Sequence, residues 1–262
     1  MTPALPDVPV VEAQIIALTN EVRAEQSLAP VRRNSQLDQA AIDYARLLAA
    51  TNQFAHDADG RGPEDRAQDA GYTYCQIAEN LALHLNSRGF SSNGLAELAM
   101  EGWLNSPGHR RNLLQPHVTE IGMAVVRAPD KHPKYISVQL FGRPQSEAYS
   151  FQVSNSSATT ITYAYGGETH DVKPGFAVRH SDCVPNTLEF TGARKSGREV
   201  RLKSRFAASD GRVYVVKGQS TGAVSVSVEQ KRTLSRNRIN RQSATTSKRP
   251  SANAVPPLPV RP

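Results

Sequence analysis

Three segments of the sequence contain residues whose types and settings could support chemistry. The first contains His56, which follows the apolar pair Phe54-Ala55 and opens a polar loop at the end of a predicted helix. Functional side chains are common where an element ends and a loop begins, and an imidazole there could ligate a metal ion. The alternative interpretation is a polar residue that caps the helix through its last carbonyl groups.

The second segment contains His109, within the sequence Ser106-Pro-Gly-His109. Ser106 is a good N-cap and Pro107 suits a first helical turn, so His109 is predicted to lie in the first turn of a helix. The positive end of the helix dipole disfavours an imidazolium there. A neutral ring could ligate a metal or polarise a carbonyl group, whereas the alternative is a solvated residue of the first turn.

The third segment contains Glu79, which is followed by Asn80 within the otherwise apolar stretch of residues 77–82. A carboxylate in such a stretch needs partners if it is buried. The alternative is an exposed carboxylate at the start of a strand or a helix.

Apolar residues at helical spacing indicate that residues 11–115 are largely helical. After that segment the pattern of apolar residues changes from one typical of helices to one typical of strands. Two β-rich runs over residues 118–142 are separated by prolines and predict an antiparallel pair of strands. Because the helices mostly precede the strands, the order favours α+β layers over a parallel doubly wound sheet.

Residues 150–228 contain short strand-like runs and turn signals such as Gly166-Gly167, which predict a small β-sandwich or barrel. From residue 231 onward the chain is basic, polar and then proline-rich, so we expect a disordered tail. This tail has eight Lys and Arg and no Asp or Glu, while the preceding 230 residues have 23 basic and 24 acidic side chains. The near-neutral remainder gives no electrostatic reason to expect specific nucleic-acid binding.

The apolar runs of the sequence are too short for a transmembrane helix, which needs about 18 residues or more. The first residues lack a basic start followed by an apolar stretch, so no signal peptide is visible. Cys75 and Cys183 fit no zinc or redox spacing. The sequence leaves open whether they form one disulfide or are two unrelated buried thiols.

Four sequence blocks in order resemble the bacterial branch of the CAP superfamily, the relatives of cysteine-rich secretory, antigen 5 and pathogenesis-related 1 proteins, also called SCP-like. The blocks read FAHDADGRGPEDR, AENLA, GWLNSPGHRRNLLQP and TEIG, and the similarity covers about residues 11–143. It implies an α-β-α sandwich with a broad cleft. Together with the residue patterns of the rest of the chain, it predicts an N-terminal extension (1–10), a CAP domain (11–145), a β domain (150–229) and a tail (230–262).

In this family, two His and two Glu converge in the cleft and can hold a divalent cation. His56, Glu79 and His109 match three of these positions, and Ser106 stands where the family commonly has the second Glu. Apolar spacing predicts that a helix in this segment faces the core with Leu95, Leu98, Ala99 and Gly102. Glu97 and Glu101 lie about 200° and 240° from Leu95 on the helical wheel and are expected to be solvated. The resemblance therefore implies a reduced site of His56, Glu79 and His109, with Ser106 or water near the fourth position.

Two imidazoles and a carboxylate form an acceptable zinc set with an open position for water. The main hypothesis is an exported protein whose cleft binds a divalent cation or a polar ligand, with the β domain assisting attachment or recognition. The alternatives are a cell-wall or peptide hydrolase, in which Glu79 could be a general base, and a lipid-binding module with a vestigial cluster. The resemblance implies an extracytoplasmic location, where a Cys75–Cys183 disulfide would hold the β domain beside the cleft and the tail could contact an anionic cell envelope.

Overall fold

The structure is a computed structural model, and it describes residues 4–195, 198–200, 204–219 and 223–230. Residues 4–147, called here the α+β region, contain five α-helices, four strands and a short 3-10 helix among the described residues. In chain order these elements are α1 (Val8–Glu25), β1 (Arg32–Arg33), α2 (Ser35–Thr51), α3 (Pro63–Asp69), β2 (Tyr74–Leu85), α4 (Ser92–Asn105), α5 (Pro107–Leu113), β3 (Glu120–Ala128), β4 (Lys134–Pro144) and η1 (Gln145–Glu147).

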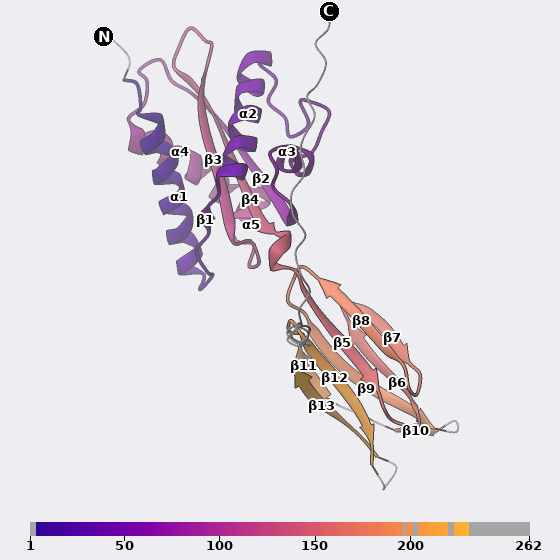
Figure 1. Ribbon diagram of the computed structural model, residues 1–262. Helices are drawn as coiled ribbons and strands as arrows, with labels where there is room; N and C mark the ends of the chain where they lie inside the picture. Colours follow the sequence, from indigo (N-terminus) through magenta and orange to yellow (C-terminus); the bar gives the residue numbers. More distant parts are fainter. Residues whose placement is uncertain (1–3, 196–197, 201–203, 220–222, 231–262) are drawn as a thin grey trace, which may run out of the picture. The chain divides into compact units, whose positions relative to one another are not determined.

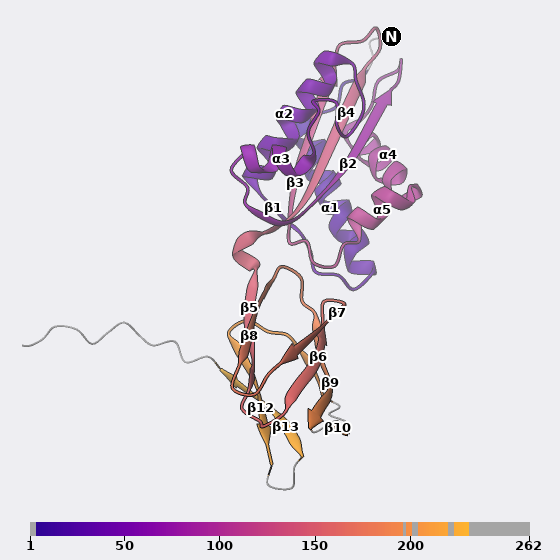
Figure 2. The ribbon, with the colours of Figure 1, turned by 90° about the vertical axis from the view of Figure 1, so that its right-hand side faces the viewer.

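The sheet of the α+β region has the strand order β1-β3-β4-β2. Helices α2 and α3 cover one face, while α1, α4 and α5 cover the other (Figures 1 and 2). Each face has its own apolar core, centred on Trp103 on the α4 side and on Tyr44 on the α2 side. This is the α-β-α sandwich that the resemblance implied.

The antiparallel pair expected over residues 118–142 is present as β3 and β4, whereas the long strand β2 is an addition to the sequence prediction. Strand β2 pairs with β4 over nearly its whole length. Its central residues are buried because helices cover both faces of the sheet. A strand covered on both faces lacks the alternation of apolar and polar residues that identifies an exposed strand.

The inward face of α4 differs from the predicted one. Leu98 was expected to face the core, but it is 41% exposed. Glu97 and Glu101 are exposed, as expected. The residues of α4 that are buried are Leu95, Ala96, Ala99, Met100 and Trp103.

The described residues from 148 to 230, called here the β-sandwich region, form two sheets and no helix. One sheet has the order β10-β9-β6-β7, with β11 also on β9, and the other has the order β13-β12-β5-β8. The strands are β5 (Tyr149–Asn155), β6 (Thr160–Tyr165), β7 (Glu168–Val172), β8 (Ala177–Asp182), β9 (Thr187–Lys195), β10 (Arg198–Val200), β11 (Ser204–Ala207), β12 (Arg212–Gly218) and β13 (Val224–Gln230).

One apolar core joins the two sheets through buried residues such as Phe151, Tyr163 and Phe190. The sequence prediction of an all-β region is therefore confirmed in its sandwich form. Strand β10 ends at Val200 and β11 begins at Ser204, and residues 201–203 between them lie outside the described residues. The predicted disordered tail lies outside the described residues.

Cys75 on β2 and Cys183, which directly follows β8, form a disulfide. Of the two possibilities that the sequence left open, the structure therefore has the disulfide and not two unrelated thiols. The bond joins the strand that carries Glu79 to the β-sandwich region. Among the described residues, no helix is long and apolar enough to cross a membrane.

Candidate functional site

Glu79 is at the centre of the candidate site, on the buried middle of β2. Its side chain is only 2% exposed, and both carboxylate oxygens are engaged. Oε1 accepts a hydrogen bond from His56 Nδ1 at 2.7 Å, and Oε2 accepts one from Arg66 Nη2 at 2.9 Å. The requirement for partners, stated from the sequence, is therefore met, and the alternative of an exposed carboxylate is wrong.

His56 lies in the turn that follows α2, with its ring on Glu79 rather than on the last carbonyl groups of the helix. The turn is held by Tyr44 of α2, whose hydroxyl donates to the Ala55 carbonyl and accepts from the Ala58 backbone N–H. The hydrogen bond to Glu79 raises the pKa of His56, although partial burial opposes this shift. Because Nδ1 is used by Glu79, Nε2 is the nitrogen that remains for a ligand.

His109 lies in the first turn of α5, whose N-cap is Ser106 as predicted. Its ring centroid is 6.3 Å from that of His56, so residues 53 positions apart in the sequence are neighbours here. The pKa of His109 is lowered, first by burial and then by the charge of His56. The expected neutral ring is therefore supported, and burial is the leading cause of the lowered pKa of His109.

A buried amide network connects β2 to α5. Asn112 Nδ2 donates to the Glu79 carbonyl at 3.0 Å and to Asn80 Oδ1 at 2.9 Å. Asn80 Nδ2 in turn donates to the His109 carbonyl at 3.3 Å and to Gln139 Oε1 at 3.0 Å. These bonds fix the backbone of His109 relative to that of Glu79, so both asparagines belong to the framework of the site.

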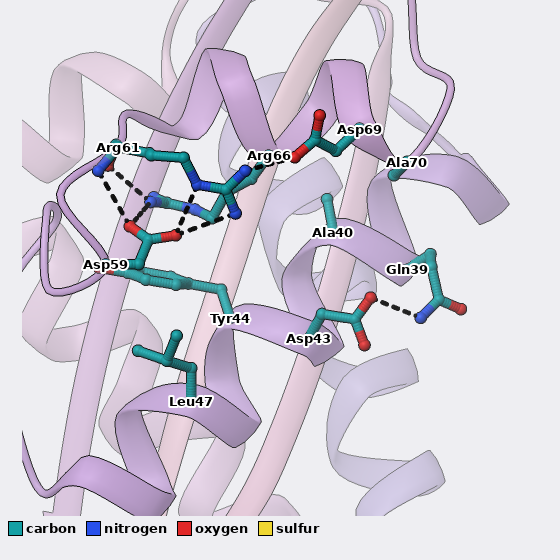
Figure 3. Close-up of a pocket in the computed structure, with 10 residues that line it drawn as sticks. All are labelled: Gln39, Ala40, Asp43, Tyr44, Leu47, Asp59, Arg61, Arg66, Asp69 and Ala70. Atoms are coloured by element: carbon teal, nitrogen blue, oxygen red, sulfur yellow. Dashed lines mark hydrogen bonds and ion pairs between the residues drawn. The ribbon is translucent and has the colours of Figure 1, made fainter.

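Arg66 of α3 is a site residue that the sequence analysis did not identify. Its guanidinium lies 3.5 Å above the Tyr44 ring and pairs with Asp59 as well as with Glu79. Figure 3 shows Arg61 and Arg66 both bonded to the carboxylate of Asp59, beside a pocket lined by residues of α2 and α3. The only sequence signal was an arginine next to the apolar Ala67 in a short helix, which does not reveal its partners.

The side chains present fit a metal site of two imidazole ligands better than a site of two imidazoles and the Glu79 carboxylate. Both Glu79 oxygens already have partners, and among the described residues no group of three or more His, Cys, Asp or Glu is arranged to hold a metal ion. The imidazoles of His56 and His109 keep nitrogens for an ion or a polar ligand. The expected contribution of Ser106 at the fourth position stays a prediction.

The comparisons with known proteins concern the α+β region. Residues 16–141 match the model of the CAP family, described as the cysteine-rich secretory protein family. Two proteins of Bacillus subtilis strain 168 are similar: the uncharacterized protein YkwD, 30% identical over 118 residues, and the uncharacterized membrane protein YlbC, 32% identical over 117 residues. These alignments cover 45% and 44% of this chain, but only 43% and 32% of the relatives.

Among solved structures, an extracellular protein containing an SCP domain from Bacillus anthracis is 31% identical, with a TM-score of 0.43, over 52% of this chain and 41% of that one. A cysteine-rich secretory protein from Staphylococcus aureus is 25% identical, with a TM-score of 0.40, over 52% and 40% of the two chains. The family match spans the helices, the sheet and all three predicted site residues. Residues 16–141 of this chain are therefore a CAP domain of the cysteine-rich secretory protein family.

Proposed function

We propose that the CAP domain binds a divalent cation, with zinc the first candidate, between the imidazoles of His56 and His109. The observation that carries this proposal is the 6.3 Å separation of the two ring centroids. With metal–nitrogen bonds of about 2.0–2.1 Å, two imidazoles on a tetrahedral ion have centroids about 5 Å apart, so the two rings need to approach each other by only about 1 Å to share one ion. The lowered pKa of His109 also favours the neutral ring that a metal ligand requires.

In this proposal Glu79 orients His56 instead of contacting the ion. Ligating histidines commonly donate their second ring N–H to a carboxylate, which fixes the tautomer and increases the basicity of the other nitrogen. The 2.7 Å hydrogen bond from His56 Nδ1 to Glu79 is such an interaction. A bound ion would supply an open coordination position for a polar group of a ligand.

We place this function outside the cytoplasm. The disulfide between Cys75 and Cys183 supports that location, since structural disulfides persist in oxidising compartments. In the same proposal the β-sandwich region assists attachment or recognition, and the eight basic residues of the tail contact an anionic cell envelope.

The second candidate function is hydrolysis of cell-wall or peptide bonds, with His56 as a general base. One observation favours it: a carboxylate that holds Nδ1 of a histidine leaves Nε2 to accept a proton, as in catalytic triads. In that case Glu79→Gln would remove turnover of a peptide or cell-wall substrate while the protein stays folded. Unchanged turnover would exclude this role for the pair.

Calorimetric titration with zinc tests the cation site. Wild-type protein should bind one ion through this site, and His56→Ala and His109→Ala should each weaken binding at least about tenfold. His132→Ala is the matched control, because His132 lies in the loop between β3 and β4, where its backbone N–H donates to Asp130 Oδ1. Equal zinc affinity in all four proteins would contradict the proposal and leave the lipid-binding alternative to be tested.

A further inference from the structure

Arg66 makes more contacts with the candidate site than its position on α3 suggests. Nη2 donates to the carboxylate of Glu79 at 2.9 Å and to the backbone carbonyl of His56 at 3.1 Å. Nη1 donates to the carboxylate of Asp59 at 3.0 Å and to the backbone carbonyl of Arg61 at 2.8 Å. One guanidinium therefore holds both ends of the turn that carries His56, together with the carboxylate that orients the His56 ring.

The charges form an alternating series from the buried site to the surface. Glu79 and Arg66 are almost fully buried, and Asp59 is 9% exposed at its side chain. Arg61, at 48% side-chain exposure, then pairs with Asp59 and with Asp69 of α3 (Figure 3). A buried charge is tolerated when partners surround it, so this arrangement strongly restricts where Arg66 can lie.

We propose that Arg66 is a positioning residue of the His56–His109 site. Its guanidinium fixes the His56 backbone directly and the His56 ring through Glu79, and so keeps Nε2 as the nitrogen available to a ligand. This inference rests on the proposed function for the identity of the ligand. Its geometric part, the fixed orientation of His56, can be measured without any ligand.

The planar shape of the guanidinium is what allows four acceptors to be bound at once. Lysine keeps the positive charge but lacks the fork-like arrangement of donors. The substitution Arg66→Lys therefore keeps a positive charge but cannot hold the Glu79 carboxylate and the His56 carbonyl in the same fixed geometry. A residue that acted through its charge alone would tolerate this change.

Arg23 provides a matched control within the same region. It is fully buried, and its guanidinium donates to the backbone carbonyls of Ala29, Leu113, Gln115 and Val118. Arg23→Lys also removes a multiply bonded buried guanidinium, but it leaves the contacts of Arg66 intact. Both variants should unfold at a lower temperature than wild type, so this control separates a general loss of stability from an effect on the site.

The experiment is zinc titration of wild type, Arg66→Lys and Arg23→Lys, at a temperature where all three are folded. We expect Arg66→Lys to weaken zinc affinity about 10–100-fold, as loss of an outer-shell partner does, and Arg23→Lys to leave it within about twofold. Folded Arg66→Lys protein with wild-type zinc affinity would overturn the positioning role. An equal loss in both variants would overturn it as well, because the effect would then follow stability.

A second measurement needs no metal. In the ¹⁵N spectrum of the neutral His56 ring at about pH 9, wild type and Arg23→Lys should carry the proton on Nδ1, and Arg66→Lys should show a mixture of tautomers. An unchanged Nδ1–H form in Arg66→Lys would contradict the inference. If wild-type protein does not bind zinc but the tautomer changes as expected, the proposed function fails and the positioning role stands.

Discussion

The α+β region and the β-sandwich region each contain a histidine in a short side-chain hydrogen bond, with opposite consequences. His56 bonds the carboxylate of Glu79 at 2.7 Å, and this bond raises its pKa. His180 bonds the phenol of Tyr163 at 2.6 Å, and burial, followed by the neighbouring charge of His170, lowers its pKa. A carboxylate partner orients the His56 ring toward a ligand, whereas the Tyr163 phenol provides a neutral hydrogen-bond partner for the partly buried His180 ring.

The side-chain amide networks around Asn112 and around Asn155 differ in how far apart in the sequence their partners lie. Asn112 connects α5 to β2 across 33 positions of the sequence. In the sandwich, Asn155 donates to the carbonyl of Thr159, four positions away, and accepts from Ser157, two positions away. The first network holds distant elements around a site, while much of the second closes a local turn. This contrast supports the proposal that the functional site lies in the α+β region.

The largest expected effect is a loss of unfolding free energy when Trp103 is truncated in the core on the α4 side of the sheet. Trp103 is 1% exposed and donates from its indole N–H to the Leu81 carbonyl of β2 at 2.9 Å. We expect Trp103→Ala to lower the free energy of unfolding by about 3–5 kcal/mol, measured by urea denaturation, and to weaken zinc binding. Phe190→Ala in the sandwich should cost a similar amount and leave the zinc affinity of the folded protein unchanged. Equal effects of both variants on zinc affinity would contradict this separation.

An intermediate effect is expected from the covalent link between the regions. The double variant Cys75→Ser/Cys183→Ser should lose about 2–4 kcal/mol of unfolding free energy, since the bond closes a chain segment of 108 residues. Thiol counting on native protein purified without reductant should find neither cysteine free. Two free thiols in that protein would exclude the bridge.

The smallest expected effect is on the free energy of unfolding, to which His56 and His180 should contribute with opposite dependence on pH. The raised pKa of His56 means that its stabilisation is complete below the unfolded value of about 6.5 and is lost as pH rises through the folded value. The lowered pKa of His180 has the opposite sign: its stabilisation is complete above about pH 6.5 and is lost as pH falls through the folded value.

Each of these contributions should be below about 1 kcal/mol, because the His56 side chain is 53% exposed and His180 is also partly exposed. Urea unfolding at about pH 5 and pH 8 should therefore show that His56→Gln reduces stability more at the acid pH, and that His180→Gln reduces it more at the alkaline pH. The same sign for both variants would remove the contrast between the regions.

The sequence predicted those features whose signals are local. Ser106 and Pro107 marked a helix start, and the apolar surroundings of Glu79 predicted that it would need partners. The convergence of His56, Glu79 and His109 came from the family resemblance. Spacing along the chain could not predict this convergence, because β2 and α5 become neighbours only in the folded structure.

The features that escaped prediction depend on contacts between distant elements. Strand β2 has no alternating pattern because both of its faces are covered, and the exposed Leu98 of α4 shows that apolar spacing gives a helix face only to within a fraction of a turn. Arg66 appears in the sequence as one charged residue in a polar stretch. Its role emerges only where α3 meets β2 and the turn that carries His56.

Anomalous X-ray diffraction from crystals grown with zinc tests most directly whether His56 and His109 form one site. The account predicts a zinc peak bonded to one nitrogen of each ring, with His56 Nδ1 still on Glu79. Zinc found only at other histidines, or the two rings turned away from each other at saturating zinc, would contradict it.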